Sequence, residues 1–469
     1  MLLSQIEFLL LLSCVMAVVC AVRSHAVQKW ILLIASYYFY AYWDWRFAGL
    51  MFLCTLINWY AAIRVARPGA SSRGRRAWFI FSVVSCLCIL GYFKYVNFFI
   101  DSWNALFGGW LSVLPVSVIL PVGISFFTFQ TMSYTIDVYR GDLQHVRSLR
   151  DLSLFVAFFP QLVAGPIVRA QEFLPQLQAP RILTGERLRH GLQQYASGFF
   201  KKIFIADRLA QYVDGCFSNA GVLDGASLWM GTLAYAAQIY CDFSGYSDMA
   251  IGLARAMGYD FSENFRHPYL AANIQDFWRR WHISLSTWLR DYLYISLGGN
   301  RRGHIRTYAN LLLTMLLGGL WHGANWTFVA WGGLHGMALA AHKIFRELRR
   351  PSGDRSPPSR AGRVLAWGST MLVVLIGWVL FRAQSFSAAF LMLSRMFSGA
   401  DGLRWIHPGA AGAFALFLLG HVSAGIARLR PLRTVDVRTV YGAAAVLVLL
   451  LAAIIWKPEG FQPFIYFQF

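Results

Sequence analysis

Leu317-Gly-Gly-Leu-Trp-His322-Gly-Ala-Asn-Trp326 joins two apolar stretches, 309–320 and 326–341, and sets a histidine between glycines at their junction. Asp, Glu, Lys and Arg are all absent within ten residues of His322 on either side. Glycines can interrupt a helix, so the pattern predicts two apolar helices that meet in a bend at His322. An ionisable side chain in such a segment is costly unless it pairs or acts. We therefore interpret His322 as functional, with a hydrogen-bonded core histidine as the alternative.

A second histidine lies in Asp276-Phe-Trp-Arg-Arg-Trp-His282-Ile-Ser-Leu-Ser-Thr-Trp288. Apolar side chains recur there at the spacing of one helical face: Ile274, Phe277, Trp278, Trp281, Leu285 and Trp288. Asp276, Arg279 and Arg280 fall on the other side. The pattern predicts one amphipathic helix, interfacial or re-entrant, on the cytoplasmic side of a membrane. His282 is a second catalytic candidate, and an interfacial histidine that faces lipid headgroups is an equally good interpretation.

The bulk composition indicates a membrane protein. Hydrophobic residues make up 57% of the chain and charged residues 14%, whereas about a quarter of an average soluble domain is charged. Apolar stretches recur along the whole chain, and several are shorter than the roughly 20 residues of a full helical span, so some must be tilted, broken or re-entrant. We predict an all-α polytopic membrane protein with roughly ten to thirteen membrane segments. Residues 1–469 are expected to form a single integral membrane domain.

The net charge of +20 does not indicate nucleic-acid binding, because the basic residues fall into short loops. Such loops are assigned to the cytoplasm: Arg64–Arg76, Arg140–Arg150, Arg301–Arg306, Arg346–Arg363 and Arg428–Arg438. This orientation puts both termini outside the cytoplasm. From a cytoplasmic Arg306, a helical rise of about 1.5 Å per residue puts His322 roughly 24 Å higher, in the outer half of the membrane. His282 is expected nearer the cytoplasm.

The two histidines suit acyl transfer. This reaction needs a base that takes the proton of an attacking hydroxyl, and neutral imidazole is the usual one. His322 fits that role, and Asn325 is a candidate for orienting a ring or a carbonyl. Asp242 and Asp248 are expected to pair with an arginine and hold helices together, because a lone carboxylate is a weaker base near neutral pH.

Five residues near His282 are candidates for binding the acyl donor: Arg279, Arg280, Trp281, Arg301 and Arg302. Guanidinium groups can hold the phosphates of coenzyme A or the acids of a carrier protein. For any single arginine, positive-inside anchoring is the better interpretation. The seven cysteines show no CxxC spacing, so no metal site and no bound cofactor are predicted. The chain has no P-loop and no GxSxG elbow, which gives ATP-driven and serine-hydrolase mechanisms no support.

Segments spread over most of the chain carry a family resemblance: Leu120–Gln130, Phe158–Ile167, Asp242–Asp248, Asn264–Tyr269, Phe277–Gly299, Trp321–Gly323 and Phe464–Phe469. In these segments the sequence resembles the membrane-bound O-acyltransferase (MBOAT) superfamily. The resemblance is greatest to the bacterial branch of alginate and cellulose O-acetylation membrane proteins, to which the teichoic-acid D-alanylation protein is related. The segments occur in order, so the likeness extends to architecture.

The resemblance implies a multi-helix fold around a central tunnel in a bacterial cytoplasmic (inner) membrane. Its motif histidines map onto His322 and His282. The donor implied is acetyl-CoA or an acyl-carrier thioester from the cytosol. The acetyl group would pass outward to an extracytoplasmic acetyltransferase partner or to the polymer itself, and the lack of an appended soluble domain favours the partner. We expect a continuous apolar passage that His322 lines from the outer half and His282 approaches from the cytoplasmic end.

Three further interpretations compete with O-acetylation of an exopolysaccharide such as alginate or cellulose. Peptidoglycan O-acetylation and D-alanyl transfer to teichoic acid belong to the same class of reaction. A transporter for a lipid-linked sugar belongs to a different class. Transporters commonly have repeated halves with binding charges near the membrane midplane, and the sequence has neither feature. The enzyme is therefore the leading interpretation.

Overall fold

The computed structural model describes residues 1, 3–108, 112–181, 183–349 and 359–427, and beyond these residues 439, 442, 444, 447, 448, 450, 451, 455, 464 and 465. Helices make up the secondary structure of this part, apart from one isolated β-bridge between Leu223 and Leu403. The chain divides into two compact units. Unit 1 holds residues 1–195 and 247–262, and unit 2 holds residues 196–246 and 263–469. A single domain over the whole chain stays a prediction.

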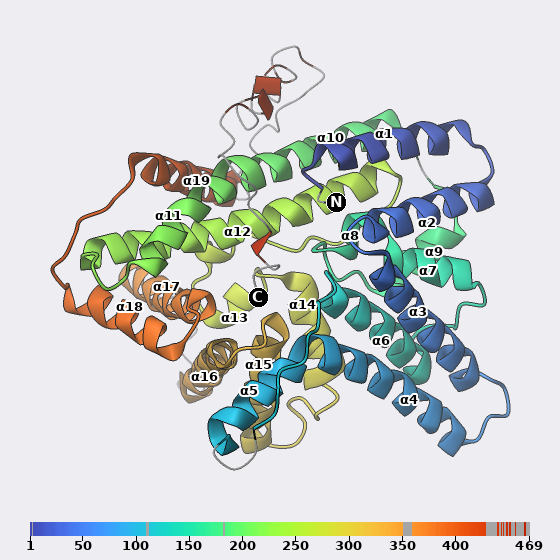
Figure 1. The fold of residues 1–469 in the computed structure, drawn as a ribbon, viewed down its shortest axis with the longest axis horizontal. Helices are drawn as coiled ribbons and strands as arrows, with labels where there is room; N and C mark the ends of the chain where they lie inside the picture. The colour runs from blue at the N-terminus through green and yellow to red at the C-terminus, as the bar shows by residue number, and fades with distance from the viewer. Residues whose placement is uncertain are drawn as a thin grey trace. The chain divides into compact units, whose positions relative to one another are not determined.

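Unit 1 is built from helices of the first half of the chain (Figure 1). They are α1 (Ile6–Ala21), α2 (His25–Ala41), α3 (Trp45–Val65), α4 (Ser72–Leu90), the π-helical turn η1 (Gly91–Tyr95), α5 (Val96–Phe107), α6 (Ile124–Arg140), α7 (Leu149–Ala157), α8 (Phe159–Leu162), α9 (Ala170–Gln178) and most of α10 (Gly185–Phe200). Residues 113–134 form one of the apolar stretches of the sequence. Only its second half is helical, because Pro115 and Pro121 keep the preceding backbone extended.

Unit 2 contains both candidate histidines. Its elements are η2 (Lys201–Ala206), α11 (Asp207–Ser218), most of α12 (Gly225–Ala256), η3 (Pro268–Leu270), α13 (Ile274–Trp278), α14 (Ile283–Trp288), η4 (Leu289–Tyr294), α15 (His304–His322), α16 (Trp326–Arg349), α17 (Arg360–Arg382), α18 (Phe386–Ser398) and α19 (Pro408–Ala427). Two of them, η2 and η4, are π-helical turns, a form that is rare and often found at functional sites.

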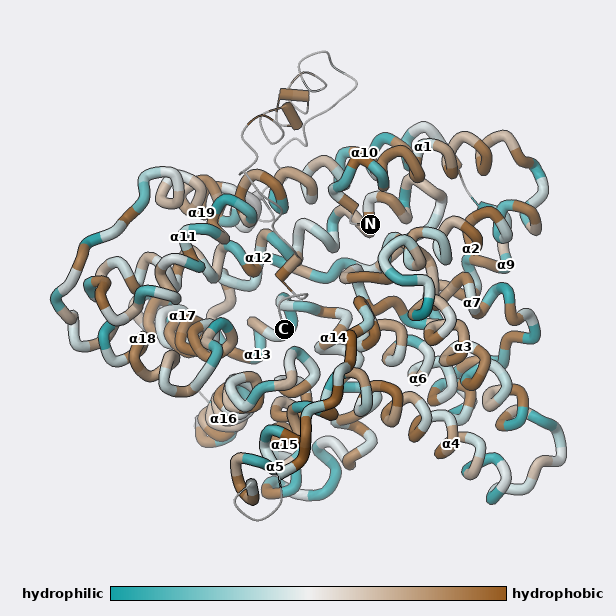
Figure 2. The backbone as a smooth tube through the Cα atoms, in the orientation of Figure 1, coloured by the Kyte–Doolittle hydropathy of each residue, from teal (hydrophilic) through white to brown (hydrophobic). Residues whose placement is uncertain are grey.

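Several helices are apolar enough to cross a membrane. By length and hydropathy, the candidate spans among the described residues are Trp45–Val65, Ser72–Phe107 and Arg360–Arg382. Shorter apolar helices are α1, α18 and most of α19. Figure 2 shows hydrophobic residues along α3 and α4 and hydrophilic ones in the loop that joins them. The structure thus has the helices of a multi-pass membrane protein, and the count of roughly ten to thirteen segments stays a prediction.

The bend predicted at His322 is confirmed. Helix α15 ends at His322, and Gly323 is extended, with φ −159° and ψ 151°. Glycines let α15 and α16 lie against each other. A Cβ atom on Gly319 would collide with the Phe328 carbonyl, and one on Gly332 with the Met315 carbonyl. Such small-residue contacts are typical of helix pairs in membranes.

The single amphipathic helix predicted around His282 is wrong. The segment forms two short helices, α13 and α14, and His282 between them has a left-handed backbone with φ +43°. The cause is a contact that the local pattern does not contain. Arg266 N donates to Arg280 O at 2.8 Å, and Ile283 N donates to Asn264 O at 2.8 Å. These bonds to the backbone of residues 264–266 replace the helical hydrogen bonds that the segment lacks at His282.

Candidate functional site

Asn264 holds His282 and fixes which ring nitrogen carries the proton. Nδ1 of His282 lies 3.2 Å from Asn264 Oδ1. The same oxygen accepts the backbone N–H of Ser284 at 3.1 Å and its hydroxyl at 2.9 Å. Because a backbone N–H can only donate, this atom is the amide oxygen, which can only accept. Nδ1 of His282 is therefore protonated, and Nε2 carries the lone pair.

Nε2 is the available nitrogen of His282. The side chain is fully buried, and Nε2 has no hydrogen-bond partner among the described residues. His282 lies outside the candidate membrane spans, and burial lowers the pKa of its imidazole. The ring is therefore neutral near pH 7. A neutral imidazole with a bare buried nitrogen can accept a hydrogen bond or a proton from a bound ligand.

His322 is enclosed by aromatic rings at the end of α15. Its side chain is 3% exposed. The centroid of its ring lies 5.1 Å from Trp321, 5.1 Å from Trp331 and 5.3 Å from Phe381. All three rings meet the imidazole edge to face, the geometry that aromatic quadrupoles favour. The imidazole is thus held in one orientation away from bulk water.

Trp321 contacts both histidines. Its ring centroid lies 6.2 Å from that of His282 and 5.1 Å from that of His322. Both imidazole rings therefore lie against the same indole. Their different depths in a membrane stay a prediction. Two pockets among the described residues, one lined by Leu311 and Leu339 and one by Phe47 and Tyr92, are not lined by either histidine. The predicted passage stays a prediction.

A third buried histidine, His335 on α16, was missed in the sequence. Its side chain is fully buried, and neither ring nitrogen has a hydrogen-bond partner in the part of the chain that the structure describes. Its ring centroid lies 4.8 Å from Trp331 and 5.2 Å from Trp278. The signal was available, since Gly332-Gly-Leu-His335-Gly336 repeats the glycine-flanked apolar setting of His322.

These side chains form one assembly, the histidine–tryptophan cluster: His282, His322, His335, Trp278, Trp321, Trp331 and Trp378. Within the described residues, the indole nitrogens of Trp278, Trp331 and Trp378 are buried without acceptors. The cluster therefore offers N–H donors beside the acceptor Nε2 of His282. Acyl transfer needs this combination, because negative charge develops on the carbonyl oxygen while a proton leaves the nucleophile.

The four arginines predicted to bind the donor are not brought together in one site. Arg280 forms an ion pair with Asp276 at 2.9 Å, one helical turn earlier, in a partly exposed position. Arg279, Arg301 and Arg302 are exposed. None of the four lines a described pocket. Their part in donor binding stays a prediction.

Trp281 and Asn325 contribute structure. Trp281 is 1% exposed and stacks on Phe277, with ring centroids 5.7 Å apart. Asn325 Oδ1 accepts the backbone N–H of Thr327 at 3.0 Å and so caps the start of α16. Its Nδ2 donates to Gln384 O at 3.1 Å. The side chain of Asn325 is thus committed to connecting α16 with the loop after α17.

Asp242 pairs with a lysine rather than the arginine we expected. Lys202 Nζ lies 2.5 Å from Asp242 Oδ1 and 2.7 Å from Asp207 Oδ1, and all three side chains are buried. The other carboxylate oxygen of Asp242 accepts the backbone N–H of Ile465 at 2.8 Å. Asp242 therefore ties α12 to η2 and to a residue near the end of the chain. Asp248 Oδ1 accepts from the side-chain amide Nε2 of Gln194 at 3.3 Å.

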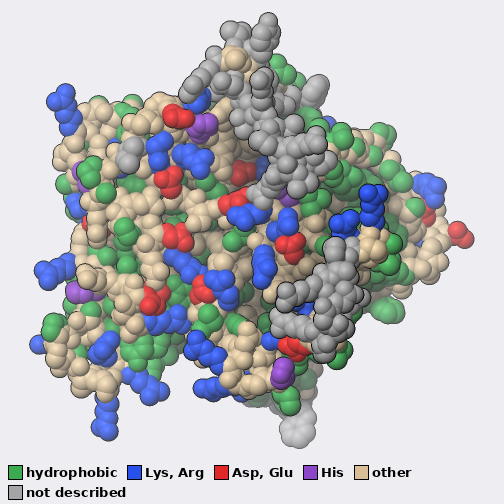
Figure 3. All heavy atoms as spheres, turned by 180° about the vertical axis from the view of Figure 1, so that it is seen from behind, with side chains coloured by type: hydrophobic (Ala, Val, Ile, Leu, Met, Phe, Trp, Pro, Cys, Tyr) green, Lys and Arg blue, Asp and Glu red, His purple; other side chains and the backbone are tan. Residues whose placement is uncertain are grey.

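The surface charge is mixed. In Figure 3, Lys and Arg side chains on the visible face are interspersed with Asp and Glu side chains and with apolar ones. Among the described residues, no group of three or more His, Cys, Asp and Glu side chains is placed to hold a metal ion.

Comparison with known proteins identifies relatives over nearly the whole chain. Residues 132–386 match the family model of the membrane-bound O-acyltransferase family. The "probable alginate O-acetylase" of Azotobacter vinelandii is 42% identical, over 94% of this chain and 94% of its own. The peptidoglycan O-acetyltransferase of Helicobacter pylori is 37% identical, over 80% of this chain and 75% of its own. The teichoic acid D-alanyltransferase of Bacillus subtilis is 29% identical, over 58% of this chain and 71% of its own.

Proposed function

Because this chain belongs to the membrane-bound O-acyltransferase family, we propose that it moves acetyl groups from a cytosolic thioester to the exopolysaccharide alginate. The observation that best supports this proposal is the near full-length similarity to a protein named as a probable alginate O-acetylase. The relatives that act on peptidoglycan and teichoic acid are less similar and cover less of this chain. That order favours alginate over the other two polymers, and cellulose has no relative here to support it.

The chemical step uses two imidazoles on either side of Trp321. The hydroxyl oxygen of the acceptor attacks the thioester carbonyl carbon, and its proton passes to His322. The carbon–sulfur bond then breaks, and the thiolate takes that proton from His322. His282 accepts a hydrogen bond from the reacting group through Nε2, since its Nδ1–H is occupied by Asn264. Indole N–H groups of the histidine–tryptophan cluster stabilise the negative carbonyl oxygen.

The burial of the site supports a partner protein as the immediate acceptor. His282 and His322 are at most 3% exposed, so a polysaccharide strand has no access to either ring without a large opening. A single hydroxyl-bearing side chain or a narrow acyl arm needs far less room. We therefore assign the onward transfer to an extracytoplasmic acetyltransferase of the same pathway.

The membrane arrangement completes the proposal. Acetyl-CoA or an acyl-carrier thioester reaches the cluster from the cytoplasmic side of the inner membrane through an apolar passage, and both termini lie on the opposite side. Short basic loops support this orientation. The protein needs no bound cofactor, because the thioester supplies the activated acetyl group.

The test is polymer acetylation in cells that express His322→Ala. Loss of a general base typically lowers a rate by about 10²–10⁴, so we expect acetylation to fall to background while membrane insertion is retained. His407→Ala is the matched control, since His407 is exposed in the loop before α19. Normal acetylation by a well-expressed His322→Ala protein would reject His322 as the base. If cells that express the wild-type protein make alginate without acetyl groups and acetylate another polymer normally, alginate is rejected as the substrate.

A further inference from the structure

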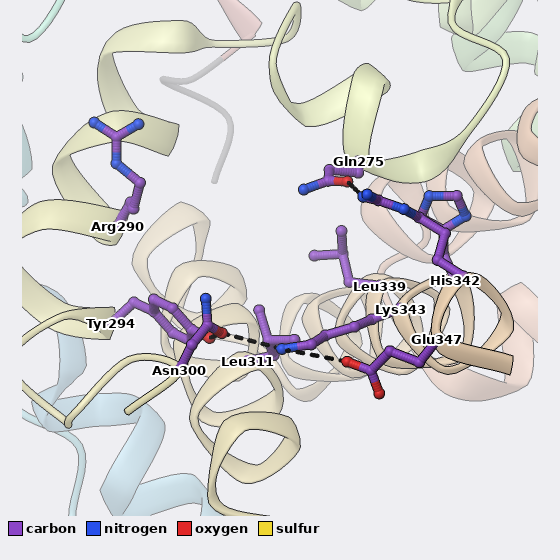
Figure 4. Close-up of a pocket in the computed structure, with 10 residues that line it drawn as sticks. Gln275, Arg290, Tyr294, Asn300, Leu311, Leu339, His342, Lys343 and Glu347 are labelled. Atoms are coloured by element: carbon purple, nitrogen blue, oxygen red, sulfur yellow. Dashed lines mark hydrogen bonds and ion pairs between the residues drawn. The ribbon is translucent and has the colours of Figure 1, made fainter. Parts of the chain in front are cut away.

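Unit 2 contains a pocket outside the histidine–tryptophan cluster, lined by charged and polar residues and by the apolar parts of their side chains (Figure 4). Its volume is about 480 Å³, within the range of small-molecule sites. Leu311 of α15 and Leu339 of α16 supply apolar surface, and the other lining residues are polar: Gln275, Arg290, Tyr294, Asn300, His342, Lys343, Arg346 and Glu347. They come from α13, η4, the loop before α15, and the last turns of α16. The pocket is thus assembled from segments that are distant in sequence.

Arg346 is an exposed residue that is oriented in this pocket by a neutral side chain, and it forms no ion pair with the carboxylates of the described residues. Its guanidinium donates to Gln275 Oε1 at 2.9 Å, and this bond joins α16 to α13. A neutral amide fixes the position of a guanidinium and leaves its charge intact. Its remaining N–H groups suit the oxygens of an anion.

The acid in the pocket is already engaged. Glu347 Oε2 accepts the hydroxyl of Tyr308 at 2.8 Å and lies 3.3 Å from His304 Nδ1. Lys343 Nζ is 4.0 Å from the other oxygen of Glu347 and donates to Asn300 Oδ1 at 3.1 Å. Three Lys or Arg side chains line the pocket against this one carboxylate. Arg290 is paired with Asp291 at 2.6 Å. The excess positive charge therefore lies at Arg346 and Lys343.

Simple helix-end stabilisation accounts for only part of this arrangement. Cations in the last turn of α16 complement the helix dipole, and a basic loop marks the cytoplasmic side. Neither effect requires a concave site or a bond from Arg346 to another helix. The exposed Arg301 and Arg302, which line no described pocket, are what topology alone produces.

We propose that this pocket binds a phosphate ester, with Arg346 and Lys343 as its contacts. The proposal rests on the proposed function, in which the donor is a cytosolic thioester whose carrier ends in phosphate. Leu311 in the pocket and His322 belong to the same helix. Eleven residues of rise separate them by roughly 16 Å. The pocket would therefore hold the phosphate end of a donor while a flexible arm carries the thioester toward the cluster.

The test uses coenzyme A as the probe, without an acyl group, and full-length protein in phospholipid-free detergent. Arg346→Gln should weaken binding about 10-fold to 100-fold, the value of one or two charge-assisted hydrogen bonds. Gln275→Glu should weaken it similarly, since a carboxylate there neutralises Arg346 without removing it. Arg363→Gln is the control: it removes the same charge from an exposed position on α17. Pantetheine, which lacks phosphate, should bind all four proteins equally.

The outcomes separate the two possible sources of phosphate. Weakened coenzyme A binding in both pocket variants identifies the donor. Unchanged binding, with loss in both variants of a co-purifying phospholipid that Arg363→Gln retains, identifies a lipid headgroup. If coenzyme A and phospholipid are bound equally by all the proteins, the proposal is overturned. If coenzyme A binding depends on Arg346 but the protein transfers no acetyl groups, the proposed function is rejected while the phosphate site is supported.

Discussion

Buried polar groups are treated differently in the hydrogen-bond network around Asn58 in unit 1 and in the histidine–tryptophan cluster of unit 2. In unit 1, Asn58 Oδ1 accepts the hydroxyls of Ser82 at 2.7 Å and Thr135 at 2.8 Å, and its Nδ2 donates to Cys54 O at 2.8 Å. These bonds join α3, α4 and α6. In the histidine–tryptophan cluster of unit 2, the described nitrogens without partners include Nε2 of His282 and both ring nitrogens of His335.

The difference distinguishes polar groups that hold helices together from polar groups that wait for a ligand. A buried polar atom without a partner costs free energy in either unit. In the Asn58 network the cost is removed by pairing within the protein, as in other interhelical networks. In the cluster it is retained, and under the proposed function a bound substrate would remove it. Single unpaired polar atoms also occur in unit 1, as at Gln130, so it is the gathering of several unpaired nitrogens that sets the cluster apart.

The largest expected effect is on transfer by His282→Ala. Losing the only bare nitrogen of that ring should lower acetylation per folded molecule by about 10²–10⁴. The ring is buried against Phe243 and bonded to Asn264, so the variant also loses packing and should unfold at a lower temperature. Asn264→Ala, which frees Nδ1, should give an intermediate loss of acetylation. Wild-type acetylation per folded His282→Ala molecule would mean that the cluster only holds helices together.

Lys202→Met tests whether pairing, rather than the unit, decides the outcome. Lys202 is in unit 2 but is fully paired with Asp207 and Asp242. Removing one partner of a buried ionic group typically costs about 3–5 kcal/mol, so the free energy of unfolding should fall by that amount. Chemical denaturation in detergent measures it. A change below about 1 kcal/mol would show that the two carboxylates do not depend on this lysine.

Asn58→Leu should remove the unit 1 network without touching the chemistry. The hydroxyls of Ser82 and Thr135 lose their shared acceptor, which costs about 1–3 kcal/mol of unfolding free energy. Acetylation per folded molecule should stay at the wild-type level. We would measure protein abundance and polymer acetylation in the same cells. A loss of transfer beyond the loss of protein would contradict the distinction between the two regions.

The smallest effect is expected at a surface pair of unit 1. Arg187 and Asp260 form an ion pair at 2.8 Å in which the aspartate is 60% exposed. Exposed pairs contribute about 0.2–1 kcal/mol, so Arg187→Gln should lower unfolding free energy by no more than this. The loss should shrink further in high salt. A cost comparable to that of Asn58→Leu would show that exposure is a poor guide to energy in this protein.

The sequence by itself determined the features whose causes are local. Apolar composition and the absence of charge around His322 predicted helices on both sides of it, and flanking glycines predicted the bend. The same reasoning applied to His335 would have found the third histidine. The family resemblance rested on contiguous motifs, which a single sequence contains in full.

Only the tertiary structure decided the geometry of the site. The helical pattern from Ile274 to Trp288 was genuine, but backbone bonds from Asn264 and Arg266 broke it at His282. The tautomer of His282, its contact with Trp321 and the bond from Arg346 to Gln275 likewise depend on segments far apart in the chain. Periodicity reports which face of a segment is apolar, whereas the partner that a polar group meets is fixed only when separate segments pack together.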